Sequence, residues 1–296
     1  MSSIYQHTLA RSASLSGVGV HSGGMVNVTV RPAPPGAGIR FVRRDAVQAN
    51  KTVAAAASCV CDTRLSTTIG NDDGVTVSTV EHLMAVFCGL AIDNAVVEID
   101  SPEAPIMDGS CQPFVRSIDR AGRITQHAPR RFVEILAPVE VRDGDKRAAL
   151  TPSDRFEIAF EIAFESAGIG RHCIDLTIDE VSFRRELADC RTFGFLHEVE
   201  ALRAAGLARG GGLDNAVVFE GGRILNPEGL RRPDECVRHK VLDAIGDLYL
   251  LGAPILGRYE GRYAGHTLNN ALVRALLDRP EAWRETVLSE DLPVAV

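Results

Sequence analysis

Hydrophobic residues follow two different periods in the first half of the chain, which indicates a mixture of strands and helices. Strict alternation with polar residues is typical of half-buried strands, and an apolar run closed by glycine is typical of a buried helix. Gly89 closes the first helix expected in this way, and Ser110 and Pro113 begin the second as its N-cap and first-turn residues. We expect strands at 26–30, 39–42 and 95–99, and helices at 80–88 and 112–121.

The second half repeats this order of elements. His82 and His239 are 157 residues apart, as are Gly109 and His266, and each of these residues lies in or just before an expected helix. The shared order and the constant offset predict two related α/β halves, each with two helices on a sheet. We expect strands at 132–141, 148–150, 156–164, 173–178 and 255–259, and helices from about residue 237 and at 268–277.

One segment, 193–222, fits neither half and is expected to be an insertion in the second. It contains a helical stretch at 198–205, three glycines at 210–212 and an apolar run at 216–219. The glycines do not form the G-x-G-x-x-G pattern that opens a helix in dinucleotide-binding proteins, so we interpret them as a flexible bend.

Composition excludes some classes of function and indicates a globular protein of about two domains. The 296 residues are 45% hydrophobic and 24% charged, and the net charge of −7 argues against a nucleic-acid surface. The longest apolar run, 83–92, is far shorter than the roughly 20 residues that span a bilayer. No secretory signal is visible, and the seven scattered cysteines include no C-x-x-C pair, so we expect reduced thiols and a cytoplasmic protein.

The strongest candidates for chemistry are His239 and Asp243, because residues four apart share one face of a helix. Catalytic zinc takes three protein ligands and leaves a fourth position for water, and a remote histidine such as His82 would complete the set. The alternative is a His–Asp hydrogen bond on a polar helix face, since H-E-x-x-H and related motifs are absent. His21 lies in a glycine-rich turn, and its role stays undecided.

Glu81, beside His82, has two competing interpretations. Ser78-x-x-Glu81 matches the capping box, in which the glutamate folds back onto the N-cap amide and is not free to act as a base. Two adjacent residues in the first turn of a helix can also both address a metal beyond the helix N-terminus. The pattern alone leaves the two open, and adjacency to His82 favours catalysis.

His266 would complete an acid–base pair with Glu81 if it reached the same cleft. Its position near a helix N-terminus disfavours the protonated form, so a general acid at this place needs a nearby carboxylate. Asp247, one turn beyond Asp243, is the candidate for that carboxylate.

Five segments closely resemble the family of UDP-3-O-acyl-N-acetylglucosamine deacetylases, the zinc amidases that commit Gram-negative bacteria to lipid A synthesis. The likeness runs from Leu9 to about Trp283, nearly the whole chain. The segments are STVEHL at 78–83, PIMDGS at 105–110, RTFGF at 191–195, RHKVLDAIGD at 238–247 and GHTLNN at 265–270.

The resemblance implies one Zn²⁺ per chain, held by His82, His239 and Asp243, with Fe²⁺ able to occupy the same ligands. It implies that Glu81 is the general base for an attacking water, and that His266 is the acid that protonates the departing nitrogen. The products would be acetate and UDP-3-O-acyl-glucosamine.

The resemblance also assigns residues around the reacting amide. Thr192 would donate a hydrogen bond to the developing oxyanion, and Asp247 would be the partner of His266. Tyr263 stands where the family often has a basic residue, with Arg262 beside it. The expected substrate contacts are Lys146, Phe193, Phe195 and Lys240.

The fold implied by the resemblance is α+β, with two related domains at 1–127 and 128–296. Each domain is a β-sheet packed on two helices, the helical layers are sandwiched between the sheets, and each domain carries a small insert. The insert at 193–222 would form an apolar passage for a fatty-acyl chain. We expect a monomer that binds one small molecule with a UDP head and an acyl chain, with no nucleic acid and no transmembrane segment.

Two alternatives are kept beside this interpretation. One is a catalytically silent zinc-binding protein that recognises sugar nucleotides, although both Glu81 and His266 are present. The other is a zinc amidase for an unacylated sugar, although the segment 216–219 is apolar.

Overall fold

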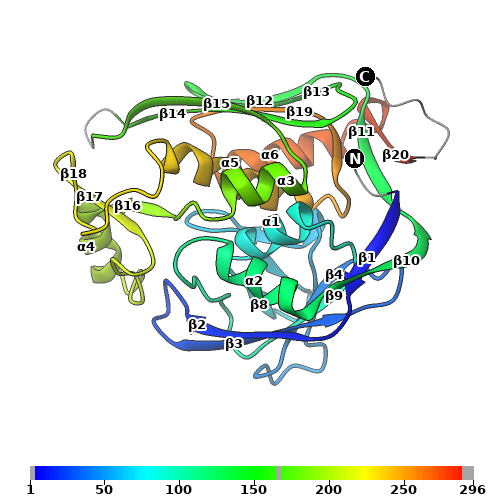
Figure 1. Cartoon of the computed structure of the whole chain (residues 1–296), viewed down its shortest axis with the longest axis horizontal. Helices are drawn as coiled ribbons and strands as arrows, with labels where there is room; N and C mark the ends of the chain where they lie inside the picture. Colours follow the sequence, from blue (N-terminus) through cyan, green and yellow to red (C-terminus); the bar gives the residue numbers. More distant parts are fainter. Residues whose placement is uncertain (1–3, 165–167, 289–296) are drawn as a thin grey trace.

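The computed structural model describes residues 4–164 and 168–288 and has the expected α+β architecture. Two sheets form the outer layers, and the main helices lie between them (Figure 1). The ends of the expected domains, 1–3 and 289–296, lie outside the described residues, as do 165–167. The helices of the middle layers are α1 (Glu81–Gly89), α2 (Gln112–Ala121), α5 (Glu235–Tyr249) and α6 (His266–Leu277).

The first sheet is formed by β2 (Ala13–Val18), β3 (Met25–Pro32), β4 (Ile39–Arg43), β5 (Thr52–Ala54) and β9 (Ala95–Ile99). Their order is β2-β3-β9-β4-β5, and within it β4 and β9 run parallel. The alternation seen in the sequence becomes an alternation of burial. Val26, Val28 and Val30 of β3 are buried, whereas Asn27 between them is exposed.

The second sheet has the same connectivity. Its strands are β12 (Val139–Asp143), β13 (Lys146–Thr151), β14 (Phe156–Phe164), β15 (Gly170–Thr177) and β19 (Ile255–Arg262). They lie in the order β12-β13-β19-β14-β15, with β14 and β19 parallel, so each strand has a counterpart in the first sheet. The internal repeat expected from the sequence is therefore confirmed. Beside the start of β19 the sheet is extended by β11 (Arg131–Ile135) and β20 (Trp283–Val287).

Both helix pairs, α1 with α5 and α2 with α6, begin 154 residues apart, but the offset between the halves is not the same for every strand. The parallel pairs begin at Ile39 and Phe156, which are 117 residues apart, but at Ala95 and Ile255, which are 160 apart. The offset grows because the segment between β15 and α5 is longer than the one between β5 and α1.

The prediction of a single strand at 132–141 was wrong, since the chain forms two strands there, β11 and β12. Leu136 and Ala137 both donate their N–H groups to the Ala282 carbonyl instead of to a neighbouring strand. Pro138 has no N–H to donate. The chain therefore leaves one side of β19 and re-enters the sheet on the other side, next to β13.

Helices α1 and α5 cross in the centre of the molecule. Nearly every residue of both helices is buried: α1 is apolar after its first two residues, whereas α5 also buries polar residues, including His239, Asp243 and Asp247. Gly246 permits the close approach, because a Cβ atom there would lie 2.0 Å from the Glu81 carbonyl oxygen. This crossing brings the first turn of α1 onto the middle of α5.

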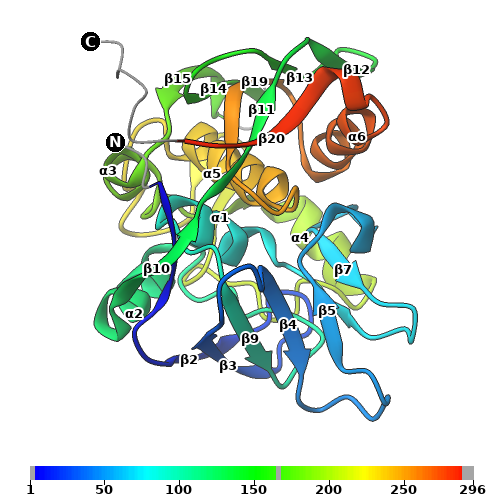
Figure 2. The same ribbon diagram turned by 90° about the vertical axis from the view of Figure 1, so that its right-hand side faces the viewer.

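One extended segment carries the chain from the first half to the second. β10 (Arg123–Pro129) pairs with β1 (Tyr5–Leu9) and continues directly into β11 (Figure 2). Residue 127, the expected end of the first domain, lies in β10. Beyond it, Arg130 Nε lies 2.7 Å from Asp93 Oδ1, and this buried ion pair holds the second half against the end of α1.

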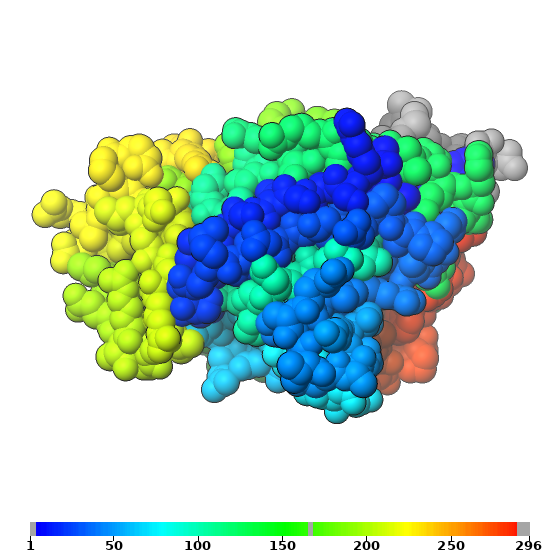
Figure 3. Space-filling model, turned by 90° about the horizontal axis from the view of Figure 1, so that it is seen from below, coloured from blue at the N-terminus to red at the C-terminus, as the bar shows by residue number. Residues whose placement is uncertain are grey.

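Each half carries an insert before its central helix. The first insert contains β6 (Val60–Asp62), β7 (Thr68–Gly70) and β8 (Thr76–Val77), and the second contains β16 (Phe193–Phe195), α4 (Leu196–Ala204), β17 (Val217–Glu220) and β18 (Arg223–Ile224). Figure 3 shows the second insert at one end of the molecule, against the β2–β3 turn, where Gly210 N donates to Val20 O at 3.0 Å. Short helical segments are η1 (Ala57–Cys59), α3 (Glu180–Ser182), η3 (Phe183–Leu187) and η4 (Pro280–Ala282). Among the described residues, no helix combines the length and apolar character needed to cross a membrane.

Candidate metal centre and active site

Two histidines and an aspartate meet where α1 crosses α5. His82 is the second residue of α1, and His239 and Asp243 lie one turn apart on α5. Asp243 Oδ1 is 3.3 Å from His239 Nε2 and 3.6 Å from His82 Nε2, and the two imidazole rings meet edge to face with centroids 5.0 Å apart. All three side chains are buried, and in the described part of the chain no other cluster of His, Cys, Asp and Glu has this geometry.

The donor atoms fit a divalent ion of the zinc type. Tetrahedral ligands at about 2.0–2.1 Å from the metal are separated from each other by roughly 3.3 Å, close to the two distances from Asp243 Oδ1. His239 Nδ1 lies 3.1 Å from the Cys190 carbonyl oxygen, which orients the ring so that Nε2 faces the other two donors. The three residues can therefore hold a metal without rearrangement of the two helices.

Asp243 is kept ionised by its surroundings. Burial opposes the charge, but the neighbouring His239 and Lys240 outweigh it and hold the pKa of the carboxyl well below its usual range. Lys240 Nζ lies 3.0 Å from Asp243 Oδ2, the oxygen turned away from the histidines. Burial lowers the pKa of Lys240, but the charge and hydrogen bond of Asp243, together with the charges of Asp247 and Glu81, outweigh it and raise the pKa. The ammonium that was expected to contact substrate is thus engaged with a metal ligand.

The capping box expected as one alternative for Glu81 is absent. Glu81 is the first residue of α1 rather than the third, and Ser78 Oγ donates to the Pro102 carbonyl oxygen at 3.2 Å. Glu81 Oε2 accepts the backbone N–H of Thr67 at 3.0 Å. Burial raises the pKa of Glu81, which makes the carboxylate a stronger base than an exposed one.

His266, the first residue of α6, is oriented by a chain of polar groups from the second half. Its Nδ1 lies 2.9 Å from Asp247 Oδ2, which also accepts from Asn269 Nδ2 at 2.8 Å, and Tyr259 O–H donates to Asn269 at 2.6 Å. Burial alone would lower the pKa of His266, but the charges of Asp247 and Glu81 outweigh it and raise the pKa to about 9. The imidazole therefore carries a proton at neutral pH, with Nε2 directed away from Asp247.

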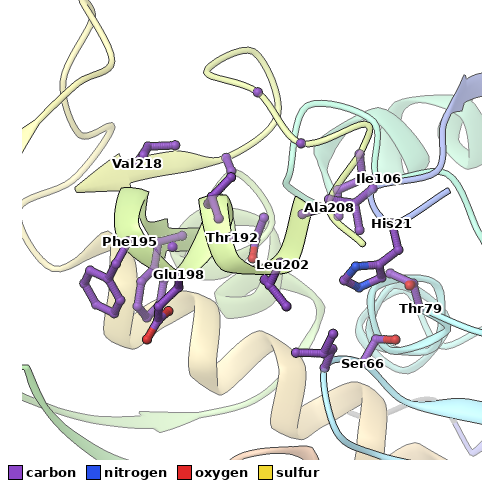
Figure 4. Close-up of a pocket in the computed structure, with 18 of the residues that line it drawn as sticks. His21, Ser66, Thr79, Ile106, Thr192, Phe195, Glu198, Leu202, Ala208 and Val218 are labelled. Carbon is purple, nitrogen blue, oxygen red and sulfur yellow. The ribbon is translucent and has the colours of Figure 1, made fainter. Parts of the chain in front are cut away.

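A cavity of about 490 Å³ begins at the metal-ligand group and extends into the second insert. Glu81, His82 and His266 line its polar end, together with the ligands on α5. Away from these residues the walls are largely apolar, with Phe193 and Phe195 on β16. Figure 4 shows Phe195 and Val218 on the insert side and Leu202 projecting toward the cavity from α4.

The first half supplies the opposite wall of the cavity, from loops that the sequence left undecided. His21, Ser66 and Thr79 lie together on this side (Figure 4). The buried Glu103 fixes the loop of His21, because its two carboxylate oxygens accept the N–H groups of His21 at 2.7 Å and Ser22 at 2.9 Å. The sequence signals for this wall were a histidine in a glycine-rich turn and the segment 78–83, which contains Thr79.

The remaining expected residues fall into two groups. Thr192 lines the cavity and is held by its backbone, since its N–H donates to the Gly109 carbonyl at 2.8 Å. Lys146 and Lys240 do not line the cavity, and Lys146 is exposed at the start of β13. Tyr263 turns back to the sheet, where its O–H donates to Glu161 Oε1 at 3.0 Å.

A buried His-His-Asp group beside a glutamate and a protonated histidine, at one end of a largely apolar cavity, defines a metal-dependent hydrolase. The model of the family described as LpxC, UDP-3-O-acyl N-acetylglycosamine deacetylase, matches residues 6–278. The chain belongs to this family.

Curated relatives are similar over almost their whole length. A UDP-3-O-acyl-N-acetylglucosamine deacetylase of Phenylobacterium zucineum is 64% identical over 293 residues, which cover 99% of this chain and 100% of the relative. The protein of the same name from Myxococcus xanthus is 51% identical over 282 residues, 95% of this chain and 89% of the relative. That from Neisseria meningitidis serogroup C is 47% identical over 295 residues, 98% of this chain and 96% of the relative.

Proposed function

We propose that the chain hydrolyses the N-acetyl group of UDP-3-O-acyl-N-acetylglucosamine and releases acetate and UDP-3-O-acyl-glucosamine. This reaction is the committed step of lipid A biosynthesis. The observation that carries the proposal is the meeting of Glu81 and His266 beside the metal-ligand group, at the polar end of a largely apolar cavity. The names of relatives that are 47–64% identical support the same activity.

The metal we propose is Zn²⁺, one per chain, held by His82 Nε2, His239 Nε2 and Asp243 Oδ1. Fe²⁺ suits the same donor set. A bound ion of this kind polarises the acetyl carbonyl and lowers the pKa of a water molecule to about 7. The buried position of the three donors supports a site that excludes bulk water.

The protein's own groups move the protons. The Glu81 carboxylate takes a proton from the water that adds to the acetyl carbon, and the Thr192 hydroxyl donates to the carbonyl oxygen as it gains charge. His266, held by Asp247, delivers a proton from Nε2 to the nitrogen as the C–N bond breaks. Each cycle leaves Glu81 with one more proton and His266 with one fewer. The transfer of one proton from Glu81 to His266 by way of solvent restores both groups.

The substrate's two ends fit different parts of the chain. The acyl chain would lie along Phe193 and Phe195 in the largely apolar part of the cavity, where contacts are non-directional. Lys146, exposed at the β12–β13 turn, would meet the diphosphate, and Lys240 would act near the sugar while paired with Asp243. We further propose a cytoplasmic monomer whose two domains divide at residues 127 and 128.

The test is an assay of acetate release by the zinc-loaded protein from UDP-3-O-acyl-N-acetylglucosamine and from the same compound without its acyl chain. We expect turnover of the first and a much lower kcat/KM for the second; equal rates would contradict the acyl site. His239→Ala should lose zinc, whereas Glu81→Ala should keep zinc and lose at least about 100-fold in kcat. Bound zinc without turnover in the wild type would instead indicate a protein that only binds sugar nucleotides.

A further inference from the structure

Thr67 lies between the two groups that move protons, yet it does not line the cavity. It is buried in the first insert, directly before β7. Its backbone N–H donates to Glu81 Oε2 at 3.0 Å, and its side-chain O–H donates to Asp247 Oδ1 at 2.6 Å. One residue therefore connects the carboxylate of the base with the carboxylate that orients the acid.

The two bonds join different halves of the molecule. Glu81 and Thr67 belong to the first half, and their relative position is fixed locally, since Val80 N also donates to the Thr67 carbonyl at 3.3 Å. Asp247 and His266 belong to the second half. The Thr67 hydroxyl thus forms a direct hydrogen bond between the Glu81–Thr67 pair of the first half and the Asp247–His266 pair of the second half.

The hydroxyl also completes the hydrogen bonding of Asp247. Oδ2 of this carboxylate is occupied by His266 Nδ1 and Asn269 Nδ2, while Thr67 donates to Oδ1. A buried carboxylate oxygen that loses its donor is costly, and the group can then turn to find another. Rotation of Asp247 would carry the His266 ring with it, because the two are joined through Oδ2.

We propose that Thr67 is a positioning residue, which sets the distance and orientation between Glu81 and the Asp247–His266 pair. The inference rests on the proposed deacetylase function. Water must lose a proton to one group and the amide nitrogen must gain one from the other, and both groups must lie within hydrogen-bond reach of a single substrate amide. Catalytic groups typically have to be held within about 0.5 Å of their productive positions. The hydrogen bond between Thr67 and Asp247 keeps Glu81 and His266 within this tolerance.

The experiment compares variants of the full zinc-loaded chain. Thr67→Val removes the hydroxyl, keeps the side-chain shape and leaves the backbone bond to Glu81. Thr67→Ser restores the hydroxyl. Thr68→Val is the matched control, because Thr68 is the next residue, is half-buried and bonds to neither carboxylate through its side chain. Zinc content and thermal unfolding are measured for each variant together with kcat and KM for the acylated substrate.

We expect Thr67→Val to lower kcat about 10- to 100-fold with KM and zinc content unchanged, as for the loss of a hydrogen bond to a charged group. Thr67→Ser should recover most of the rate, and Thr68→Val should match the wild type. In the double variant Thr67→Val/Asp247→Asn, the rate should be no lower than in Asp247→Asn alone, because both changes break one connection.

Several results would overturn the inference. A wild-type kcat in Thr67→Val would remove any role of the hydroxyl in turnover. A fall that serine does not restore, that appears equally in KM, or that adds to the effect of Asp247→Asn would assign Thr67 to general stability of the fold. An inactive wild-type protein with zinc bound would be a different failure, since it overturns the proposed function and this inference with it.

Discussion

The cavity has two ends that are built in different ways. At the polar end, three of the key side chains are held by a partner from another element: Glu81 by Thr67, His266 by Asp247 and His239 by the Cys190 carbonyl. At the other end, α4 covers the cavity without burying a single one of its own residues. Hydrogen bonds orient the side chains at the polar end, whereas the insert meets the cavity largely with apolar side chains.

This difference follows from what each end has to recognise. Proton transfer depends on distance and direction, so a displacement of about 1 Å is costly. An acyl chain is held in proportion to the apolar area that it buries, about 25 cal/mol per Å², and small shifts of the wall cost little. Changes at the polar end should therefore appear in kcat and in pH dependence, and changes at the insert in KM for acylated substrate.

The largest effect should come from Asp247→Asn at the polar end. The pKa of His266 stands at about 9: burial opposes the proton, but Asp247 and Glu81 outweigh it, and of the two Asp247 acts more strongly. A group with a raised pKa keeps its proton below that pKa and loses it as the pH rises through it. Removing the Asp247 charge lowers the pKa, so less acid is present at neutral pH and the alkaline limb of the kcat profile should move to lower pH.

We expect a loss of about 100-fold in kcat for this variant, the size of a general-acid contribution. The measurement is a pH profile of kcat for the zinc-loaded variant and wild type side by side. Asp278→Asn serves as the control, because Asp278 is exposed at the other end of α6. An alkaline limb at the same pH in Asp247→Asn and wild type would show that Asp247 does not set the proton affinity of His266.

A smaller effect, of the other kind, is expected at the insert. Leu202 on α4 lines the cavity, so Leu202→Ala removes part of the wall along which an acyl chain would lie. The lost contact should raise KM for acylated substrate about tenfold and leave kcat within about twofold. For the substrate without its acyl chain, kcat and KM of Leu202→Ala should equal those of the wild type. The control Glu200→Ala, which alters an exposed residue of the same helix, should match the wild type with both substrates. A fall in kcat with both substrates would mean that the two ends are not independent.

The sequence predicted the polar end better than the rest of the site, and the reason is local geometry. His239 and Asp243 share a helix face by their spacing alone, and the repeated order of elements pointed to His82. The start of α1 was harder to place, because Thr79 adopts a positive φ of 58° and the helix begins only at Glu81. A β-branched residue rarely adopts this conformation, and no pattern in the sequence announces it.

Contacts between loops could not be predicted at all. Glu103 accepts hydrogen bonds from two amides more than 80 residues earlier in the chain, and Thr67 reaches an aspartate 180 residues later. Neither residue lies in a periodic segment, so neither its burial nor its partner follows from neighbouring residues. These positions depend on how the two halves assemble, whereas the strands of both sheets follow from alternation within each segment.

The smallest predicted effect concerns Glu103, which ties the first half to the insert and therefore tests how separate the two ends are. Its carboxylate holds the turn at His21 and Ser22, and carbonyls of the same turn accept from Arg209 and Gly210 of the insert. Glu103→Gln leaves one acceptor oxygen and faces an NH₂ group toward the second N–H. We expect Tm to fall by about 2–4 °C and KM for acylated substrate to rise a few-fold, with kcat nearly unchanged.

Thermal unfolding and steady-state kinetics check this prediction, with Glu285→Gln as a control that alters an exposed ion pair on β20. If Glu103→Gln lowered kcat instead of raising KM, the turn would act on the chemistry as well as on the acyl wall. The hydrogen bonds of Glu103 argue against that outcome, because they end at the backbone of a turn and not at any group that moves a proton. The turn should therefore behave as part of the adaptable wall, although it belongs to the half that supplies the base.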